Sequence, residues 1–216
     1  MDPKFVLSHV DHTLLKPEAT FADISRLCEE ALFWHTASVC INPRYVEYAV
    51  TLLGGKLPVC TVIGFPLGAM TAPAKVFEAQ DAVSRGAGEI DMVISVGDLI
   101  EGRMSAVQEE IAAVKQAIGE RILKIIIETC LLTESQKIEM CRIVADAGAD
   151  YIKTSNGFSS GGATFDDVAL MVKHGAGRIK VKAAGGIRSF GDMERFLELG
   201  ADRLGCSSAV RLASAE

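Results

Sequence analysis

Short runs of β-branched and other aliphatic residues recur along the chain, and each is followed by an amphipathic segment long enough for a helix. Periodicity, run length and the glycines between runs favour strands for eight of these runs. They are Ser8–Leu14, Ala37–Ile41, Pro58–Gly64, Glu89–Ser95, Leu123–Thr129, Asp150–Ser155, Ile179–Ala183 and Asp202–Cys206. Regular alternation of strand and helix predicts a parallel sheet with helices packed against its outside.

Eight units in 216 residues average 27 residues each, which is close to the length of one strand–helix unit. Eight such units are the number that closes a TIM barrel. An open, doubly wound sheet is the alternative, and the absence of a G-x-G-x-x-G turn after the first strand disfavours it. We therefore predict an α/β protein, a single (β/α)8 TIM barrel, with residues 1–216 forming one domain.

Helix boundaries support this division of the chain. Three candidate N-caps stand three residues before a polar partner, as in a capping box. The pairs are Thr20 with Asp23, Thr133 with Gln136, and Ser189 with Asp192. A Gly-Ala pair beginning at residue 86, 148 or 200 precedes three of the strands, and glycine tolerates the left-handed backbone at the end of a helix.

Composition narrows the class of partner and the compartment. The formal net charge is −6 and the sequence has no basic run, which disfavours binding to nucleic acid. None of the six cysteines forms a C-x-x-C pair, so we expect free thiols in a reducing cytoplasm. We also expect no signal peptide and no membrane association, because no apolar segment is long enough for either.

Charged residues inside predicted barrel strands are the strongest indication of chemistry. Lys153 and Lys182 lie on neighbouring strands, six and seven, which are about 4.8 Å apart. Two ammonium groups that close repel each other, so one should lose its proton near neutral pH. A neutral lysine amine can attack a carbonyl carbon. The alternative is that both lysines reach solvent or form ordinary ion pairs, but their pairing with Asp91 favours a catalytic role.

Acidic residues in the strands provide candidates for proton transfer. Ile90 and Met92 should face the helices, which turns Asp91 into the barrel beside the lysines. A carboxylate there can move protons in Schiff-base chemistry, or it can form a structural ion pair. Asp11 and Glu128 are expected on the first and fifth strands, where either could position a lysine or balance its charge. We expect Lys180 at the solvent-exposed rim.

Two glycine-rich turns follow the last two strands, at Gly185–Arg188 and Gly205–Ser208. Loops seven and eight of such barrels commonly bind phosphate, because backbone N–H groups and helix N-termini attract anions. The hydroxyls of Ser207 and Ser208 can add hydrogen-bond donors.

The sequence offers little for a metal ion. The four histidines lack ligand spacing, and a site built from His9, Asp11 and His12 is disfavoured. We therefore predict no metal ligands. We expect Cys40 to point into the barrel as a small buried thiol.

The order and spacing of several short segments resemble the deoxyribose-phosphate aldolase family over nearly the whole chain. The most specific segment is Tyr151-Ile-Lys-Thr-Ser followed by Asn156-Gly-Phe. The others are Asp11-His-Thr-Leu-Leu, Val39-Cys-Ile-Asn-Pro, Thr61-Val-Ile-Gly-Phe-Pro, Glu89-Ile-Asp-Met-Val-Ile, Lys124-Ile-Ile-Ile-Glu-Thr, Val181-Lys-Ala-Ala-Gly-Gly-Ile-Arg and Gly205-Cys-Ser-Ser.

The resemblance implies a class I aldolase that uses neither a metal ion nor an organic cofactor. Such an enzyme reversibly cleaves 2-deoxy-D-ribose 5-phosphate to D-glyceraldehyde 3-phosphate and acetaldehyde, a step in deoxyribonucleotide catabolism. By this resemblance Lys153 forms the Schiff base, Lys182 favours its neutral amine, Asp91 relays protons and Asp11 organises the network. The residues implied to bind phosphate are Gly157, Gly185, Gly186, Arg188, Gly205, Ser207 and Ser208.

Three departures from the family pattern bear on the details. Asn156 stands where threonine is usual, and Cys206 stands where threonine or alanine is more common; both affect the expected phosphate affinity. The segment Leu212–Glu216 lacks a terminal tyrosine, so a role of the tail in proton transfer is not expected to follow from the family. Two alternatives stay open at this point: another phosphosugar-acting barrel enzyme, and a non-catalytic phosphosugar-binding barrel. We also expect a homo-oligomer.

Overall fold

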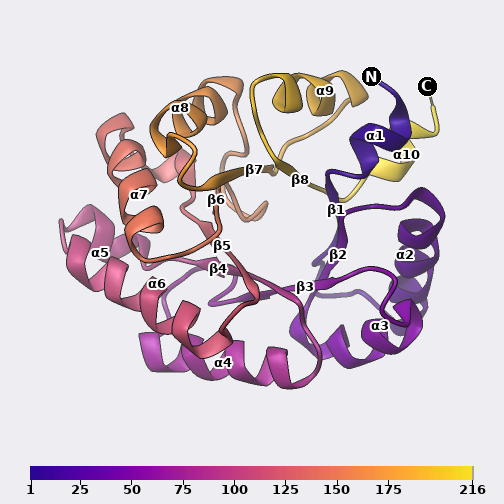
Figure 1. The fold of residues 1–216 in the computed structure, drawn as a ribbon, viewed down its shortest axis with the longest axis horizontal. Coiled ribbons are helices and arrows are strands. Elements are labelled where there is room, and N and C mark those ends of the chain that lie inside the picture. The colour runs from indigo at the N-terminus through magenta and orange to yellow at the C-terminus, as the bar shows by residue number, and fades with distance from the viewer. Residues whose placement is uncertain (216) are drawn as a thin grey trace.

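A computed structural model describes residues 1–215, and in it eight parallel strands form a closed barrel in sequence order (Figure 1). The strands are β1 (Val10–Leu14), β2 (Ser38–Ile41), β3 (Val59–Ile63), β4 (Glu89–Val93), β5 (Ile122–Ile126), β6 (Tyr151–Lys153), β7 (Lys180–Ala184) and β8 (Arg203–Cys206). Every predicted strand is present, and the predicted TIM barrel is confirmed.

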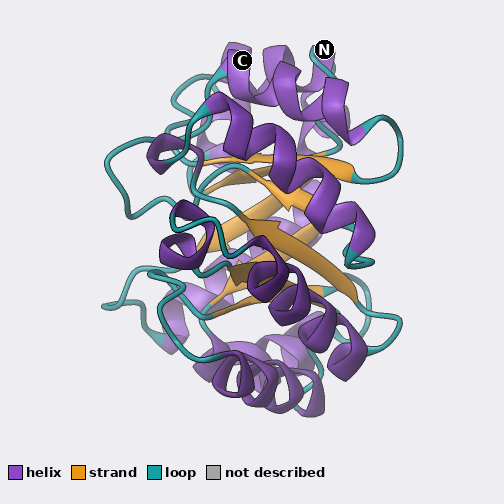
Figure 2. Ribbon diagram, turned by 90° about the vertical axis from the view of Figure 1, so that its left-hand side faces the viewer, coloured by secondary structure: helices purple, strands orange, loops and turns teal. Residues whose placement is uncertain are grey.

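Helices surround the barrel, as Figures 1 and 2 show. They are α1 (Pro3–Leu7), α2 (Phe21–Trp34), α3 (Val46–Leu53), α4 (Ala72–Ser84), α5 (Val96–Ile100), α6 (Met104–Ile118), α7 (Glu134–Asp146), α8 (Phe165–Gly175), α9 (Phe190–Glu198) and α10 (Ala209–Ala213), with 3-10 turns η1 (Pro43–Tyr45) and η2 (Thr129–Leu131). The helix α1 precedes the first strand and packs beside α10, so the two ends of the chain lie close together.

The main hydrophobic core lies between the strands and the helices. Outward-facing strand residues such as Ile90, Met92 and Ile125 belong to this core and are completely buried. A small apolar cluster, built on Cys40, Cys60 and neighbouring residues, lies inside the barrel. Cys40 therefore lies inside the barrel, as expected. Because apolar residues fill the outer layer, the inward positions of the strands are available for polar side chains.

All three predicted capping boxes are present, at Thr20, Thr133 and Ser189. The predicted Gly-Ala helix ends are also confirmed. At the end of α4, the N–H of Gly86 donates to the carbonyl of Val83, and the N–H of Ala87 donates to that of Ala82. These two bonds make a Schellman motif, in which Gly86 has the left-handed φ of 100° that favours glycine. The helices that end in a Gly-Ala pair therefore stop shortly before the next strand.

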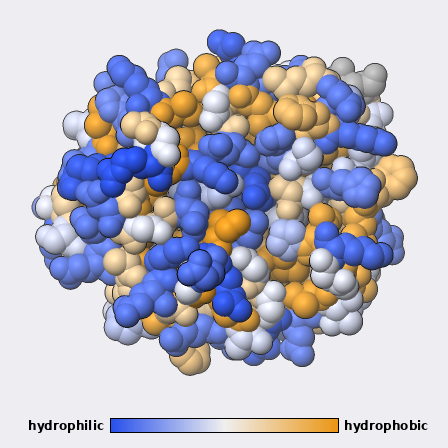
Figure 3. Space-filling model, viewed as in Figure 1, coloured by the Kyte–Doolittle hydropathy of each residue, from blue (hydrophilic) through white to orange (hydrophobic). Residues whose placement is uncertain are grey.

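Hydrophilic residues are spread over the face of the molecule shown in Figure 3, with apolar residues in small areas between them. Among residues 1–215, no helix is both long enough and apolar enough to cross a membrane.

The capping box of α7 provides a test of helix termination. The Thr133 hydroxyl accepts from the N–H of Gln136 at 3.4 Å, and the Gln136 side chain accepts from the N–H of Thr133 at 2.9 Å. Thr133→Ala should lower the free energy of unfolding by about 1 kcal/mol, measured by urea denaturation. Thr51→Ala is the control, because the Thr51 hydroxyl bonds only a carbonyl of its own helix; equal losses in both variants would contradict the capping role.

Candidate active site

Strand register brings the charged residues together inside the barrel. Asp91 of β4 pairs with Lys124 of β5, and Lys153 of β6 pairs with Lys182 of β7. The neighbours of Asp91, Ile90 and Met92, are packed in the outer core. Because successive side chains of a strand point to opposite faces, Asp91 faces inward, as predicted.

The Asp91 carboxylate is the centre of the cluster and is completely buried. One oxygen, Oδ2, accepts from the Nζ atoms of Lys153 at 2.8 Å and Lys182 at 2.6 Å. These two nitrogens are therefore at most 5.4 Å apart, the sum of the two distances. The other oxygen, Oδ1, accepts from Lys124 Nζ at 2.9 Å and from Cys60 Sγ at 3.1 Å. All the hydrogen-bonding capacity of this carboxylate is thus used by its neighbours.

Asp11 of β1 forms a second buried centre. Its Oδ2 accepts from Lys182, and its Oδ1 accepts from Ser38 Oγ at 2.7 Å and from Arg203 of β8. Lys182 therefore lies between two carboxylates, whereas Lys153 contacts only one. A third carboxylate belongs to Glu89, whose Oε2 lies 2.6 Å from Lys124 Nζ and 3.3 Å from Arg203 Nη1.

The electrostatics follow from burial and from these pairs. Burial opposes ionisation of Asp11 and Asp91, but the surrounding cations outweigh it and hold the pKa of both carboxyls below its ordinary value. Burial likewise opposes the charge on Lys124 and Lys182, but the carboxylates raise the pKa of both lysines. The two carboxylates on either side of Lys182 therefore favour its charged form.

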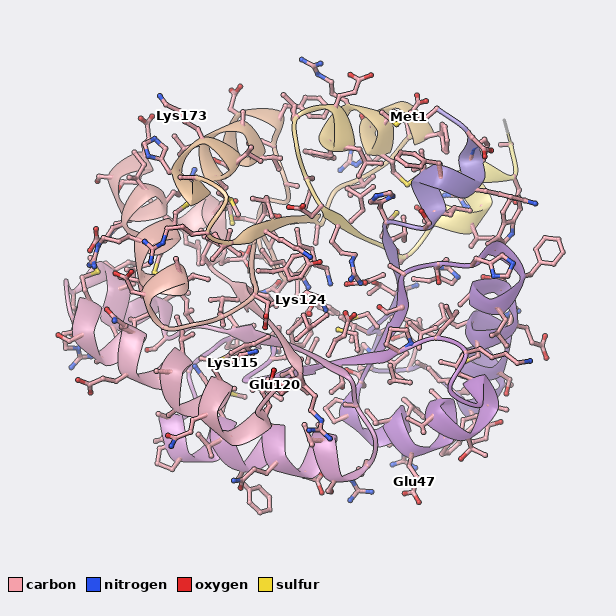
Figure 4. All side chains as sticks on the ribbon, viewed as in Figure 1. Met1, Glu47, Lys115, Glu120, Lys124 and Lys173 are labelled. Carbon is pink, nitrogen blue, oxygen red and sulfur yellow. The ribbon has the colours of Figure 1, made fainter. Side chains whose placement is uncertain are left out.

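A cavity of about 300 Å³ opens at the C-terminal ends of the strands and reaches Lys153. Lys153 is 3% exposed, whereas Lys124 and Lys182 are 0% exposed and do not line the cavity. In Figure 4, Lys124 lies near the centre of the barrel, well inside the ring of helices. Of these three buried lysines, Lys153 is the one whose side chain a ligand in the cavity can touch.

Five of the predicted phosphate-binding residues line this same cavity: Gly157, Gly185, Gly186, Gly205 and Ser207. Two others lie outside its lining. The side chain of Arg188 is exposed, and the backbone N–H of this residue donates to Asp192 Oδ2 at 3.1 Å. Ser208 stands before α10 and has its Oγ 3.5 Å from Cys206 Sγ.

The chain matches the model of the DeoC/LacD family aldolases over residues 5–205. It is 50% identical over 209 residues to a deoxyribose-phosphate aldolase of Clostridioides difficile, covering 97% of this chain and 95% of that protein. The chain belongs to the DeoC/LacD family of aldolases.

Solved structures of aldolases have the same fold as this family member. The tetrameric deoxyribose phosphate aldolase of Aeropyrum pernix superimposes with a TM-score of 0.89 at 31% identity, covering 99% of this chain and 91% of that one. The aldolase QR15 gives a TM-score of 0.94 at 37% identity, covering 97% and 95% of the two chains.

The prediction that Glu128 lies on strand β5 is wrong. The strand ends at Ile126, and Glu128 has a left-handed backbone with φ 55°, so the alternation of the strand does not extend to it. Its carboxylate accepts from the N–H of Asn156 at 3.1 Å, and burial raises the pKa of the Glu128 carboxyl. Glu128 therefore holds the loop after β6, and none of its hydrogen bonds within the described chain is to a lysine.

The sequence pattern places Gly205 both in the last predicted strand and in the turn after it; the structure confirms the strand, because this residue lies within β8. A Cβ atom there would lie 2.9 Å from Ala184 Cβ and 3.1 Å from Lys182 Cε. The missing side chain therefore gives the Lys182 stem room to cross the barrel. Gly185 and Gly186 do form a turn after β7, with φ values of 83° and 74° that favour glycine.

Asn156, one of the departures from the family pattern, connects two loops. Its side-chain amide donates to the carbonyl of Pro66 at 2.8 Å, and its side-chain oxygen accepts from the N–H of Phe158 at 2.6 Å. Asn156 and Cys206 both line the cavity. Of the tail, Glu216 lies outside the described residues.

Three charged members of the cluster, Lys124, Glu89 and Arg203, were not identified as site residues from the sequence. Glu89 could have been found from the sequence, because it lies two residues before Asp91 and so points to the same face of the strand. Lys124 lies directly opposite Asp91 in the register of β4 and β5. Lys180 lies at the exposed rim as expected, with its Nζ 5.5 Å from the centre of the Tyr151 ring.

The histidines do not approach the charged cluster. His12 Nε2 bonds Glu30 Oε2 at 2.7 Å, on the side away from Asp11, and His9 Nδ1 bonds the carbonyl of Phe5 at 2.9 Å. Cys40, Cys60 and Asp91 bring their ligand-type atoms within 4.8 Å of one another. Burial raises the pKa of the Cys60 thiol, which donates to Asp91. That arrangement favours a hydrogen-bonded thiol over a metal ligand.

The depressed pKa of Asp91 predicts a dependence of stability on pH. A carboxyl whose pKa is lowered by folding stabilises the protein above its ordinary value of 3.8, and this stabilisation is lost as pH falls toward the folded value. The free energy of unfolding of the wild type should therefore decrease below about pH 4. In Asp91→Asn that slope should be shallower by about 1.4 kcal/mol per pH unit.

Urea denaturation between about pH 2.5 and pH 6 measures both slopes. Asp166→Asn is the matched control, because Asp166 is an exposed aspartate in the first turn of α8. Parallel acid limbs for the wild type and Asp91→Asn would show that the ion pairs of Asp91 do not persist in solution.

Proposed function

We propose that this chain is a class I aldolase that reversibly cleaves 2-deoxy-D-ribose 5-phosphate to D-glyceraldehyde 3-phosphate and acetaldehyde, with Lys153 as the Schiff-base lysine. The observation that carries the proposal is the position of Lys153. Its amine lies between the cavity and the Asp91 carboxylate, and a second lysine, Lys182, contacts the same carboxylate oxygen.

The charges around Lys153 balance one another. The cluster contains three carboxylates, from Asp11, Glu89 and Asp91, and three other cations, from Lys124, Lys182 and Arg203. These six charges cancel, so the surroundings of Lys153 carry no net charge in a site shielded from water. Uncompensated buried charge is costly. The nucleophile is thus prepared by its surroundings before substrate enters.

The reaction begins when Lys153 Nζ attacks C1 of the open-chain sugar. The nitrogen–carbon bond forms, the carbonyl oxygen takes a proton, and loss of water from the carbinolamine gives a protonated imine. Lys182 and Asp91 are the proton donor and acceptor within reach, since both contact Lys153 or share its hydrogen-bond partner.

Carbon–carbon cleavage follows from the electron demand of the imine. The proton of the C3 hydroxyl passes to the Asp91 carboxylate, which contacts Lys153; the C2–C3 bond breaks, and its electron pair moves into an enamine on Lys153. D-Glyceraldehyde 3-phosphate, which carries C3 to C5, leaves first. Protonation of the enamine at C2 and hydrolysis of the resulting imine then release acetaldehyde and restore the amine.

We assign the phosphate to the glycine-rich loops that line the cavity. Gly157, Gly185 and Gly186 have no side chains to hinder an anion, and Ser207 adds a hydroxyl. The N-terminus of α9 follows the Gly185 turn closely, and a helix N-terminus attracts anions. Arg188 and Ser208 are assigned to this site by the resemblance, although neither lines the cavity.

We further propose a homo-oligomer in a reducing cytoplasm, which binds neither nucleic acid nor membranes. The oligomer is supported by the tetrameric relative of Aeropyrum pernix. The compartment is supported by the six cysteines, all of which are free thiols.

Covalent trapping tests the Schiff base directly. Incubation with acetaldehyde and borohydride should add about 28 Da, a reduced ethyl group, to one lysine per chain. Peptide mapping should place the adduct on Lys153, and Lys153→Ala should lose both trapping and cleavage of the phosphosugar. Lys173→Ala is the control, because Lys173 lies on the outside of α8, far from the cluster (Figure 4). An adduct on another residue would refute the assignment.

Removal of the second cation tests the role of Lys182. The Lys153 and Lys182 nitrogens are at most 5.4 Å apart, and at that distance, with an effective dielectric constant near 20, two positive charges repel by roughly 3 kcal/mol. Lys182→Leu removes this repulsion from the site. The alkaline-rising limb of kcat/KM should therefore shift to higher pH by about two pH units in Lys182→Leu.

The comparison variant for this test is Lys182→Arg, which keeps the charge and should leave the limb near its original position. Both variants need circular dichroism spectra like that of the wild type before the profiles are compared. Coincident limbs for Lys182→Leu and the wild type would exclude electrostatic tuning by Lys182.

A further inference from the structure

The cavity contains few positive charges for a ligand that carries a phosphate. Its lining includes two lysines, Lys16 and Lys153, and within the described chain no arginine. Lys153 is committed to covalent chemistry and to Asp91. Arg188, the cation expected at the phosphate, lies outside the lining. Lys16 is therefore the one cationic side chain of the cavity that is free to meet a phosphate group.

The backbone of Lys16 is held in place at the rim. The residue follows β1, and its carbonyl accepts from Ala19 N at 3.2 Å and from Asn42 Nδ2 at 3.4 Å. Its side chain is 70% exposed. Because the backbone is held and the side chain is exposed, rotation of the side chain alone can bring the ammonium group to a ligand in the cavity.

Lys16 lies beside the loop proposed to bind phosphate. Strand β1 pairs with β8 in the register His12 to Cys206, so the segments after these two strands are neighbours. Lys16 and Ser207 line the 300 Å³ cavity together, and both also line an adjoining depression of about 440 Å³. Lys16 and Ser207 thus lie on the same side of the cavity.

The current partner of Lys16 binds it weakly. The Lys16 Nζ and Glu18 Oε1 atoms are 4.0 Å apart, and both side chains are about 70% exposed. An exposed pair of this kind contributes little stability. Exchange of Glu18 for a dianionic phosphate therefore has a small cost and a larger electrostatic gain.

We propose that Lys16 is a specificity-determining residue that contacts the substrate phosphate from the β1 side of the cavity. The inference rests on the proposed function, and it adds a side-chain cation that lines the cavity, which Arg188 does not. Because Lys16 touches the phosphate and not the reacting carbons, its contribution is to binding of the phosphorylated substrate.

The test compares phosphorylated and unphosphorylated substrate in Lys16 variants. A charge-assisted hydrogen bond that is partly exposed predicts that Lys16→Met raises KM for 2-deoxy-D-ribose 5-phosphate about tenfold. The kcat for this substrate should change by less than about twofold. For 2-deoxy-D-ribose, which has no phosphate, kcat/KM should be unchanged. Lys16→Arg should restore most of the affinity, and Lys16→Glu should raise KM further than Lys16→Met.

Lys173→Met is the matched control, since it removes an equal charge from the outer surface and should leave both substrates unaffected. Equal effects of Lys16→Met on the two substrates would overturn the proposal, because they would indicate a structural role. A KM for the phosphosugar within twofold of the wild-type value would overturn it as well.

Equilibrium binding separates this inference from the proposed function. If the wild type neither cleaves the phosphosugar nor traps acetaldehyde, the proposed function fails, but inorganic phosphate still reports on Lys16. Titration calorimetry should show phosphate binding that weakens about tenfold in Lys16→Met and recovers in Lys16→Arg. Phosphate affinity that is equal in all three proteins would overturn the role of Lys16 independently of catalysis.

Discussion

The Asp91 carboxylate is the interaction on which the rest of the site depends. It receives hydrogen bonds from three lysines and a cysteine, which come from β3, β5, β6 and β7. Removing one partner of a buried ion pair typically costs about 3–5 kcal/mol, since the remaining charge is left uncompensated. Here one carboxylate compensates several charges at once, so its loss would affect both the nucleophile and the cation that accompanies it.

Burial of several charged side chains has a large desolvation cost, and the architecture of the barrel explains how the protein tolerates it. TIM barrels usually fill the interior with layers of branched aliphatic side chains. In this chain those side chains are concentrated outside the strands, where Ile90, Met92 and Ile125 meet the helices. The hydrophobic stabilisation therefore comes mainly from the outer layer. Beside a small apolar cluster, the interior holds carboxylates and cations, whose mutual attraction offsets much of their desolvation.

Much of this could be predicted from the sequence, because period and capping are local properties. The eight strands, the capping boxes and the inward orientation of Asp91 all follow from patterns within about ten residues. Glu128 was misplaced because its left-handed backbone interrupts the strand, and that change is not visible in the residue type.

Other features depend on partners that are distant in the sequence. A glycine can serve a turn, or it can leave room for a neighbouring side chain, and the sequence pattern cannot distinguish these roles at Gly205. The position of the Lys182 stem shows that this glycine leaves room. Lys75 is a similar case. It is completely buried outside the barrel, 2.6 Å from Glu110, whose other oxygen accepts from the N–H of Ser95. Nothing near Lys75 in the sequence indicates that it would anchor the loop after β4.

The two lysines of β6 and β7 illustrate what the three-dimensional arrangement adds. The sequence pattern treats Lys153 and Lys182 alike, because it places both on strands and turns both inward. They also pair directly across the sheet. The structure makes them different through Asp11, which contacts Lys182 and lies too far round the barrel to bond Lys153. Two carboxylates keep Lys182 charged, while Lys153 shares one carboxylate and faces the cavity. Division of labour between two identical side chains thus arises from the closure of the barrel, which places β1 beside β8 and brings Asp11 to Lys182.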